Sequence, residues 1–98
     1  MTTHDLKCWT EYFNPVWNGV KLFEIRKNDR NYKVGDYLRL KDYNPTTEKY
    51  MGRELLCKVT YLLDNKAFLA EGYVAMSLQV VERTTPSMDE RLEEMVFI

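Results

Sequence analysis

A chain of 98 residues can bury one hydrophobic core but not two, so we expect a single domain. The composition is 45% hydrophobic and 30% charged, with four glycines and three prolines, which excludes a disordered or low-complexity chain. No apolar run is long enough for a signal peptide or a membrane helix, and the net charge is −1. We therefore expect a cytoplasmic protein without membrane contact, and the net charge alone does not favour a nucleic-acid ligand.

The first predicted element is a strand over residues 4–8, in which Leu6 and Cys8 share one face. The second cysteine, Cys57, also lies in a segment of alternating apolar residues. Two reduced, buried thiols are the expected state, and a Cys8–Cys57 disulfide is the alternative. His4 is the only histidine and no residue pair has zinc-like spacing, so we expect no metal and no cofactor.

A helix is predicted over residues 9–18, because aromatic and apolar side chains recur there at helical spacing. Gly19 just past its end is typical of a helix C-terminus. Either Thr10 caps this helix, or Asn14 caps a shorter one that has Pro15 at its first position. Pro15 argues against one continuous helix through the segment.

Four further strands follow, predicted from alternating apolar residues between turn residues. They are expected at residues 21–26, 37–41, 55–63 and 73–81, with a hairpin loop over residues 43–52. In the strand over residues 55–63, one side is expected to carry Cys57, Val59, Tyr61 and Leu63. The expected inward set of the last strand is Val74, Met76, Leu78 and Val80. About five strands and one short helix predict an α+β, mainly β fold, a small mixed barrel.

The C-terminal segment differs in character from the rest of the chain. We assign residues 4–83 to the barrel domain and residues 84–98 to a tail. In the tail, Ser87 and Glu90 have the spacing of a capping box, which indicates a second helix with an apolar end. This tail would dock on the barrel or contact a partner.

Positive charge is concentrated in one part of the chain. Residues 21–41 contain seven Lys or Arg and three Asp or Glu, which gives +4, whereas the rest of the chain carries −5. A local basic stripe on an acidic background can attract a phosphate backbone. A solvated, lysine-rich loop is the alternative interpretation.

The densest polar chemistry lies within residues 19–30. Gly19, Lys21, Glu24 and Arg26 match the four fixed positions of G-x-K-x-x-E-x-R, and here the sequence resembles the ASCH domains of the PUA-like superfamily. The match is closer to a bacterial and phage branch labelled DUF3850. The elements that carry this resemblance are His4–Lys7, Glu11–Phe13, Gly19–Arg30, Val34–Asp36 and Gly72–Val74.

This resemblance implies a small β-barrel with a cleft beside the motif strand, and RNA-related work in a bacterial or phage-infected cell. Some similar proteins hydrolyse an acetylated cytidine with a lysine, a threonine three residues later and a separate glutamate. Lys21 matches the lysine, but Glu24 stands at the threonine position. The chain departs from the hydrolase pattern at that residue.

The side chains of the motif also have a chemistry of their own. Arg26 presents five donors in a planar fork that suits a phosphate or a guanine edge. Glu24 can accept a hydrogen bond from an exocyclic amine or orient Arg26, and Lys21 could act as a base if it were desolvated. Strict strand alternation places Lys21 on the opposite face, unless it belongs to the turn before the strand. An ion pair on a solvated strand face is the alternative interpretation.

Three functions are weighed from these observations. The first is binding of RNA or of a nucleoside or nucleotide, without a metal, through Lys21, Glu24, Arg26, Arg30, Lys7 and Asn28, although Asn28 also suits a turn. The second is an amidohydrolase that acts on N-acylated cytidine-like nucleosides, with Lys21 as the base and Glu24 as a proton shuttle. The third is an adaptor that binds another protein through the apolar tail.

Overall fold

Five strands and one helix make up the regular structure of residues 1–86, the residues that the computed structural model describes. In chain order they are β1 (Thr3–Trp9), α1 (Thr10–Trp17), β2 (Phe23–Lys27), β3 (Tyr37–Asn44), β4 (Lys49–Leu63) and β5 (Tyr73–Thr84). Each predicted strand and the first predicted helix is present, and β4 begins earlier than expected. The capping box and helix predicted for the tail lie outside the described residues.

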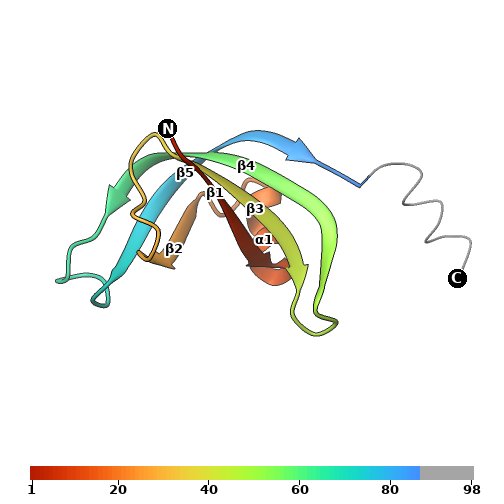
Figure 1. The fold of residues 1–98 in the computed structure, drawn as a ribbon, viewed down its shortest axis with the longest axis horizontal. Helices are drawn as coiled ribbons and strands as arrows, with labels where there is room; N and C mark the ends of the chain where they lie inside the picture. The colour runs from red at the N-terminus through yellow and green to blue at the C-terminus, as the bar shows by residue number, and fades with distance from the viewer. Residues whose placement is uncertain (87–98) are drawn as a thin grey trace, which may run out of the picture.

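The strands form one sheet in the order β1-β3-β4-β5-β2 (Figure 1). β1 and β3 are parallel and the other three pairs are antiparallel, so the sheet is mixed. Figure 1 shows the sheet bent into an arch, with α1 beneath its concave face. The prediction of a mainly β, mixed fold with one short N-terminal helix is confirmed, and β1 and β2 are the two ends of a half-barrel.

The hydrophobic core lies between the concave face of the sheet and α1. Phe13 and Val16 of the helix are fully buried against the sheet. Alternate residues of the strands complete the core: Leu6, Cys8, Leu38, Leu40, Leu55, Cys57, Val59, Val74, Met76 and Leu78. The inward set predicted for β5 is confirmed, because Val80 also packs against this core.

Both cysteines are free and buried, which confirms two buried thiols and not a disulfide. Burial raises the pKa of Cys8 to about 11 and the pKa of Cys57 to about 12. The negative charge of Glu24 adds to both shifts. Neither thiol is therefore suited to nucleophilic chemistry in the folded protein.

A bulge in β4 changes which residues face the core. Tyr61 and Leu63 were predicted to share one side of the strand with Cys57 and Val59, but the pairing of β4 with β5 shifts register between Val59 and Tyr61. Tyr61 is consequently 65% exposed, and Leu62 packs against the core in its place. The prediction was wrong beyond Val59, because an extra residue in a strand exchanges the two faces.

The helix also departs from prediction at its start. Its N-cap residue is Trp9, which makes no side-chain capping hydrogen bond, and Pro15 lies inside one continuous helix. Neither predicted cap is therefore present. A proline in an eight-residue helix removes a single interior hydrogen bond, which tertiary packing can offset. The predicted end is confirmed, since Gly19 has φ 75° and its N–H donates to Val16 O at 3.0 Å.

Asp42 of β3 connects the helix to the sheet. Its carboxylate is 1% exposed and accepts Thr10 Oγ1 at 2.6 Å and Arg53 Nε at 3.0 Å. The Arg53 guanidinium lies 4.9 Å from the ring centroid of Phe13 and 5.0 Å from that of Trp17. A helix without a capping side chain is thus fixed over the core by one buried carboxylate and one arginine.

A second buried polar pair joins β1 to the loop before β3. His4 Nε2 lies 2.9 Å from Asp36 Oδ2, and the ring of Tyr32 packs edge-on against His4 at 4.8 Å. The same carboxylate accepts the backbone N–H groups of Thr2 and Lys33. Burial acts to raise the pKa of Asp36, but these hydrogen bonds outweigh it and hold the pKa below its ordinary value of 3.8.

Within residues 1–86, no helix has the length and apolar character needed to cross a membrane.

Candidate functional site

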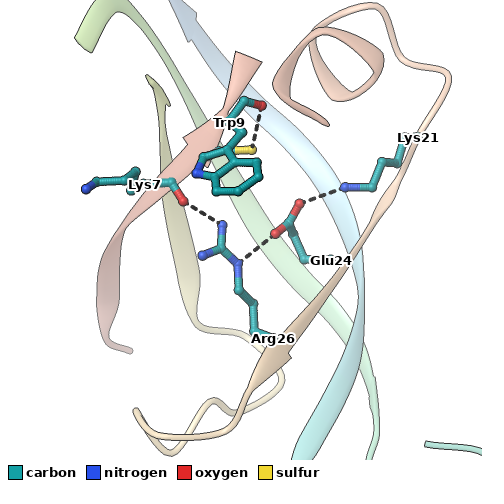
Figure 2. Close-up of polar contacts among 6 residues, drawn as sticks. Lys7, Trp9, Lys21, Glu24 and Arg26 are labelled. Atoms are coloured by element: carbon teal, nitrogen blue, oxygen red, sulfur yellow. Dashed lines mark hydrogen bonds and ion pairs between the residues drawn. The ribbon is translucent and has the colours of Figure 1, made fainter. Parts of the chain in front are cut away.

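A cleft of about 1050 Å³ lies between the two end strands of the sheet, β1 and β2. Its lining residues come from β1, α1, β2, the segment before β2 and the start of β5: Lys7, Cys8, Trp9, Tyr12, Lys21, Phe23, Glu24, Ile25, Arg26 and Tyr73. Lys21, Glu24 and Arg26 of the motif all line this one cleft. Figure 2 shows the three side chains directed toward one another, with the Trp9 ring beside them.

The position of Lys21 decides between the two arrangements that alternation left open. β2 begins at Phe23, so Lys21 lies in the turn before the strand. The backbone N–H of Lys21 donates to the backbone carbonyl of Pro15 at 3.0 Å, which fixes the turn against the end of α1. Lys21 Nζ then donates to Glu24 Oε1 at 3.0 Å. The strand alternation therefore does not separate these two side chains.

Glu24 is a buried carboxylate, not a member of a solvated strand face. The residue is 3% exposed, and its side chain points to the concave side while Phe23 and Ile25 of the same strand are about half exposed. Oε1 accepts Lys21, and Oε2 accepts Arg26 Nε at 2.9 Å. The side chains of Lys21 and Arg26 are 21% and 26% exposed, so solvent reaches the cationic partners but not the carboxylate.

Arg26 also bridges the gap between the end strands. Its Nη2 donates to the backbone carbonyl of Lys7 at 2.9 Å, as Figure 2 shows. Arg30 makes a similar contact further along, from Nη1 to the carbonyl of Asp5 at 2.8 Å. Because these carbonyls belong to the open edge of β1, arginine side chains here take the place of a neighbouring strand.

The polar part of the cleft offers more donors than acceptors. The Lys21 ammonium has three N–H groups and uses one of them for Glu24. Arg26 Nη1 has no hydrogen-bond partner within residues 1–86. Both oxygens of Glu24 already accept a cationic donor. A ligand would thus meet unused N–H groups and one positive charge in excess.

Exposed aromatic side chains form the rest of the cleft wall. Trp9, Tyr12, Phe23 and Tyr73 are each between 42% and 51% exposed. The rings of Trp9 and Tyr12 stack with centroids 6.3 Å apart, and Lys21 Nζ lies 5.2 Å from the ring centroid of Phe23. Exposed aromatic groups beside cations can stack on flat ligands.

Sequence reasoning did not select Trp9, Tyr12 or Phe23 for the site. No sequence signal distinguishes a buried ring from one at the rim of a cleft. Only their closeness to the motif could have drawn attention to them. Tyr73, at the start of β5, also lines the cleft.

The remaining predicted ligand residues lie further from the centre of the cleft. Lys7 contributes its carbonyl, while its ammonium lies 4.1 Å from the ring centroid of Tyr43 and points away from Glu24 (Figure 2). Arg30 and Asn28 do not line the cleft. Asn28 Oδ1 accepts the N–H of Tyr32 at 3.1 Å, as expected of a turn residue.

The described residues contain no group of three or more His, Cys, Asp or Glu side chains that could bind a metal ion. The side chains that line the cleft include the ion-paired cations, the carboxylate and the aromatic rings. Lys21 and Arg26 can donate to ligand oxygens, and the rings can cover a planar group.

Comparison with known proteins places this arrangement in a family. Residues 3–78 match a family model described as "Domain of unknown function (DUF3850)". The chain is also similar to the "Uncharacterized 12.9 kDa protein in GpA 3'region" of Escherichia phage P2, with 36% identity over 73 residues. That alignment covers 74% of this chain and 64% of the phage protein. The chain belongs to the DUF3850 family.

Proposed function

We propose that the cleft binds one nucleotide unit, either as part of an RNA strand or as a free, unmodified or modified nucleotide or nucleoside. The observation that carries this proposal is that one cleft is lined both by two cations with unused N–H groups and by four half-exposed aromatic rings. A nucleotide has the complementary parts, a planar base with hydrogen-bond acceptors and an anionic phosphate.

Each part of the cleft has a role in this proposal. Aromatic side chains stack on bases irrespective of sequence, since every base has a π face. Lys21 and Arg26 donate to base carbonyls or to phosphate oxygens. Glu24 sets the position of both cations through its two hydrogen bonds. The volume of about 1050 Å³ is ample for one nucleotide.

The alternative is that Lys21, Glu24 and Arg26 only stabilise the fold. Ion pairs of that kind are expected on a solvated face, where they contribute little. Here the carboxylate is buried, and the space beside it is lined by apolar rings that remain open to solvent. A protein that needed only the ion pairs would gain by covering those rings.

The resemblance of the motif to the ASCH domains of the PUA-like superfamily supports the proposal further. Gly19, Lys21, Glu24 and Arg26 occupy the four fixed positions of that signature, and in this chain Gly19 ends α1 while the other three residues line the cleft. We include membership of the ASCH group in the proposal.

The test is a titration of the folded protein with UMP, CMP, GMP and AMP, followed by tryptophan fluorescence. We expect saturable quenching, because Trp9 lies in the cleft and is 47% exposed. Lys21→Ala should weaken binding by about tenfold, since it removes a charge-assisted donor. The matched control is Lys66→Ala, which removes an exposed cation that pairs with Glu71 outside the cleft.

The phosphate part of the proposal has a separate readout. Affinity for UMP and for short RNA should fall as salt rises, because ion release accompanies phosphate binding. The proposal is wrong if no nucleotide or RNA quenches the fluorescence, or if Lys21→Ala and Lys66→Ala have equal effects. Binding that is insensitive to salt would limit the contact to the base.

A second candidate is an amidohydrolase on N-acylated cytidine-like nucleosides, and the observation in its favour is that the expected base and proton shuttle, Lys21 and Glu24, lie together at the cleft. General-base chemistry needs a neutral amine, whereas the 3.0 Å contact between Lys21 Nζ and Glu24 Oε1 suits an ammonium that donates to a carboxylate. Incubation with N4-acetylcytidine tests it: turnover that disappears in Lys21→Ala supports hydrolysis, and no turnover removes it. The tail on which the adaptor hypothesis depends lies outside the described residues.

A further inference from the structure

Three aromatic residues occupy neighbouring positions on three adjacent strands of the sheet. The strand register places Trp9 of β1 beside Tyr43 of β3, and Tyr43 beside Tyr50 of β4. The rings of Tyr43 and Tyr50 are 5.0 Å apart between centroids, and Tyr50 is 57% exposed. We call these three residues the aromatic row. It crosses three neighbouring strands, about 4.8 Å apart.

Cations lie beside the aromatic row, two residues along the strands. Lys7 of β1 pairs in register with Lys41 of β3, and both side chains point to the outer face, as their positions alternate with buried residues. Two residues of a strand span about 6–7 Å, so the two lysines flank the row closely. Lys7 Nζ lies 4.1 Å from the Tyr43 centroid.

Acidic residues near these cations do not neutralise them fully. Asp5 pairs with Arg39 at 3.2 Å and lies 4.0 Å from Lys41, and Glu54 lies 3.8 Å from Arg39. All four side chains are between 35% and 54% exposed. Ion pairs between exposed side chains contribute little to stability, so ligand phosphates can replace the carboxylates as partners of these cations. With Lys7 included, this part of the face has one positive charge in excess.

Trp9 belongs to both surfaces. It is in register with Tyr43 on the outer face, while its ring lines the cleft and stacks on Tyr12. Trp9 is therefore the residue of the row that lies at the cleft, and Tyr43 and Tyr50 occupy the next two strands. A ligand that leaves the cleft past Trp9 meets the other two rings next.

We infer that the aromatic row is a stacking platform that extends the cleft into a binding track for single-stranded RNA. This inference rests on the proposed function, and it names the ligand of the same site as a strand of several nucleotides. One nucleotide lies in the cleft, the following bases stack on the exposed rings of Trp9 and Tyr50, and the phosphates contact Lys7 and Lys41. Tyr43 lies between these two rings, with Lys7 Nζ over its ring and Tyr50 against it edge to face. Alternating rings and cations on an open sheet suit single strands, in which the bases are free to stack.

A comparison of ligand lengths tests the inference. The probes are UMP, followed by tryptophan fluorescence, and a fluorescein-labelled uridine octanucleotide, followed by anisotropy. We expect the octanucleotide to bind at least about tenfold more tightly than UMP, since each added stacking contact contributes. Tyr50→Ala should weaken octanucleotide binding by about fivefold or more and leave UMP binding unchanged.

Tyr61→Ala is the matched control, because Tyr61 is 65% exposed on the same strand but lies outside the row, in register with Ser77 of β5. It should change neither affinity. The inference is overturned, and the cleft proposal stands, if Lys21→Ala weakens both ligands but Tyr50→Ala and Tyr61→Ala weaken neither.

Two other outcomes overturn both proposals. If Tyr50→Ala weakens octanucleotide binding and Lys21→Ala does not, the outer face binds single strands by itself, and both the cleft proposal and the inference that the row extends the cleft fail. If neither UMP nor the octanucleotide binds, both proposals fail.

Discussion

Glu24 is the residue around which the cleft is organised. It lies on an end strand, is 3% exposed, and accepts one cationic donor on each carboxylate oxygen. A buried charge is stable only when its partners are in place, and here the partners come from the turn before β2 and from the same strand. The position of Lys21 and Arg26 in the cleft thus depends on a third residue that solvent hardly reaches.

Substitution of this carboxylate should destabilise the whole domain. We expect Glu24→Ala to lower the free energy of unfolding by about 2 kcal/mol, because it leaves two partly buried cations without their acceptor. Urea unfolding at neutral pH measures the change. Glu71→Ala is the control, since Glu71 is 83% exposed and its pair with Lys66 should contribute less than about 0.5 kcal/mol. Equal effects of the two variants would contradict this role.

The thiols provide a second prediction at this scale. Burial raises the pKa of Cys8 to about 11 and of Cys57 to about 12, so at pH 8 almost no thiolate is present in the folded protein. Labelling with Ellman's reagent should be slow in buffer and complete in denaturant. Labelling of either cysteine in buffer at the rate of a free thiol would show that it is more accessible than the structure has it.

Sequence reasoning identified the motif residues of the cleft but not the residues around them. It selected Lys21, Glu24 and Arg26, which line one cleft. It could not place Lys21 relative to Glu24, because β2 begins at Phe23, where it pairs with Ser77 of β5, a strand that is distant in sequence. For the same reason it could not recognise Trp9 as a cleft residue.

Among the elements, α1 depends most on its neighbours. It is eight residues long, contains a proline and has no capping side chain, so its own propensity is weak. Asp42 and Arg53 supply the missing contacts, and through the helix they determine where Tyr12 enters the cleft.

Loss of this contact should therefore affect stability strongly. Asp42→Ala is expected to lower the free energy of unfolding by about 3 kcal/mol, because it leaves two donors, the Thr10 hydroxyl and the Arg53 guanidinium, without their fully buried acceptor. Urea unfolding is again the measurement, and Asp5→Ala, with a side chain that is 54% exposed, is the control. A loss below about 1 kcal/mol would mean that packing alone positions the helix.

Element types could be predicted from the sequence, but details set by tertiary contacts could not. The alternation of apolar residues correctly predicted β1, β3 and β5 and the faces that they turn to the core. In β4 the residues predicted to share one side do so up to Val59, and the prediction fails at Tyr61 because the bulge shifts the alternation. Pro15 was expected to interrupt the helix, and the packing of Phe13 and Val16 against the sheet overrides that tendency.

At the scale of the whole molecule, the sheet has two open ends that side chains bridge. Arg26 and Arg30 donate to carbonyls of β1, and the cleft lies between these contacts and α1. The His4–Asp36 pair fixes the N-terminal strand to the loop that carries Arg30 and Tyr32. The half-barrel keeps its shape through polar contacts as well as through its core.

The stability of the molecule should accordingly depend on the charge of Asp36. Its folded pKa lies below the ordinary value of 3.8, so its contribution is present above that pH and is lost as pH falls through the folded pKa. At pH 6, Asp36→Asn should unfold at lower urea than the natural protein, and the difference should shrink below about pH 4. A difference that stays constant from pH 6 to pH 3 would contradict the linkage.

The central claim, that a nucleotide binds between the end strands, has a direct test in the two tryptophans. Trp9 lines the cleft, whereas Trp17 packs against the core beside Arg53. In a ¹H–¹⁵N spectrum recorded during titration with UMP, we predict that the indole N–H signal of Trp9 shifts and saturates while that of Trp17 stays in place. An unchanged Trp9 signal at saturating UMP, or a shift of Trp17 alone, would contradict the claim.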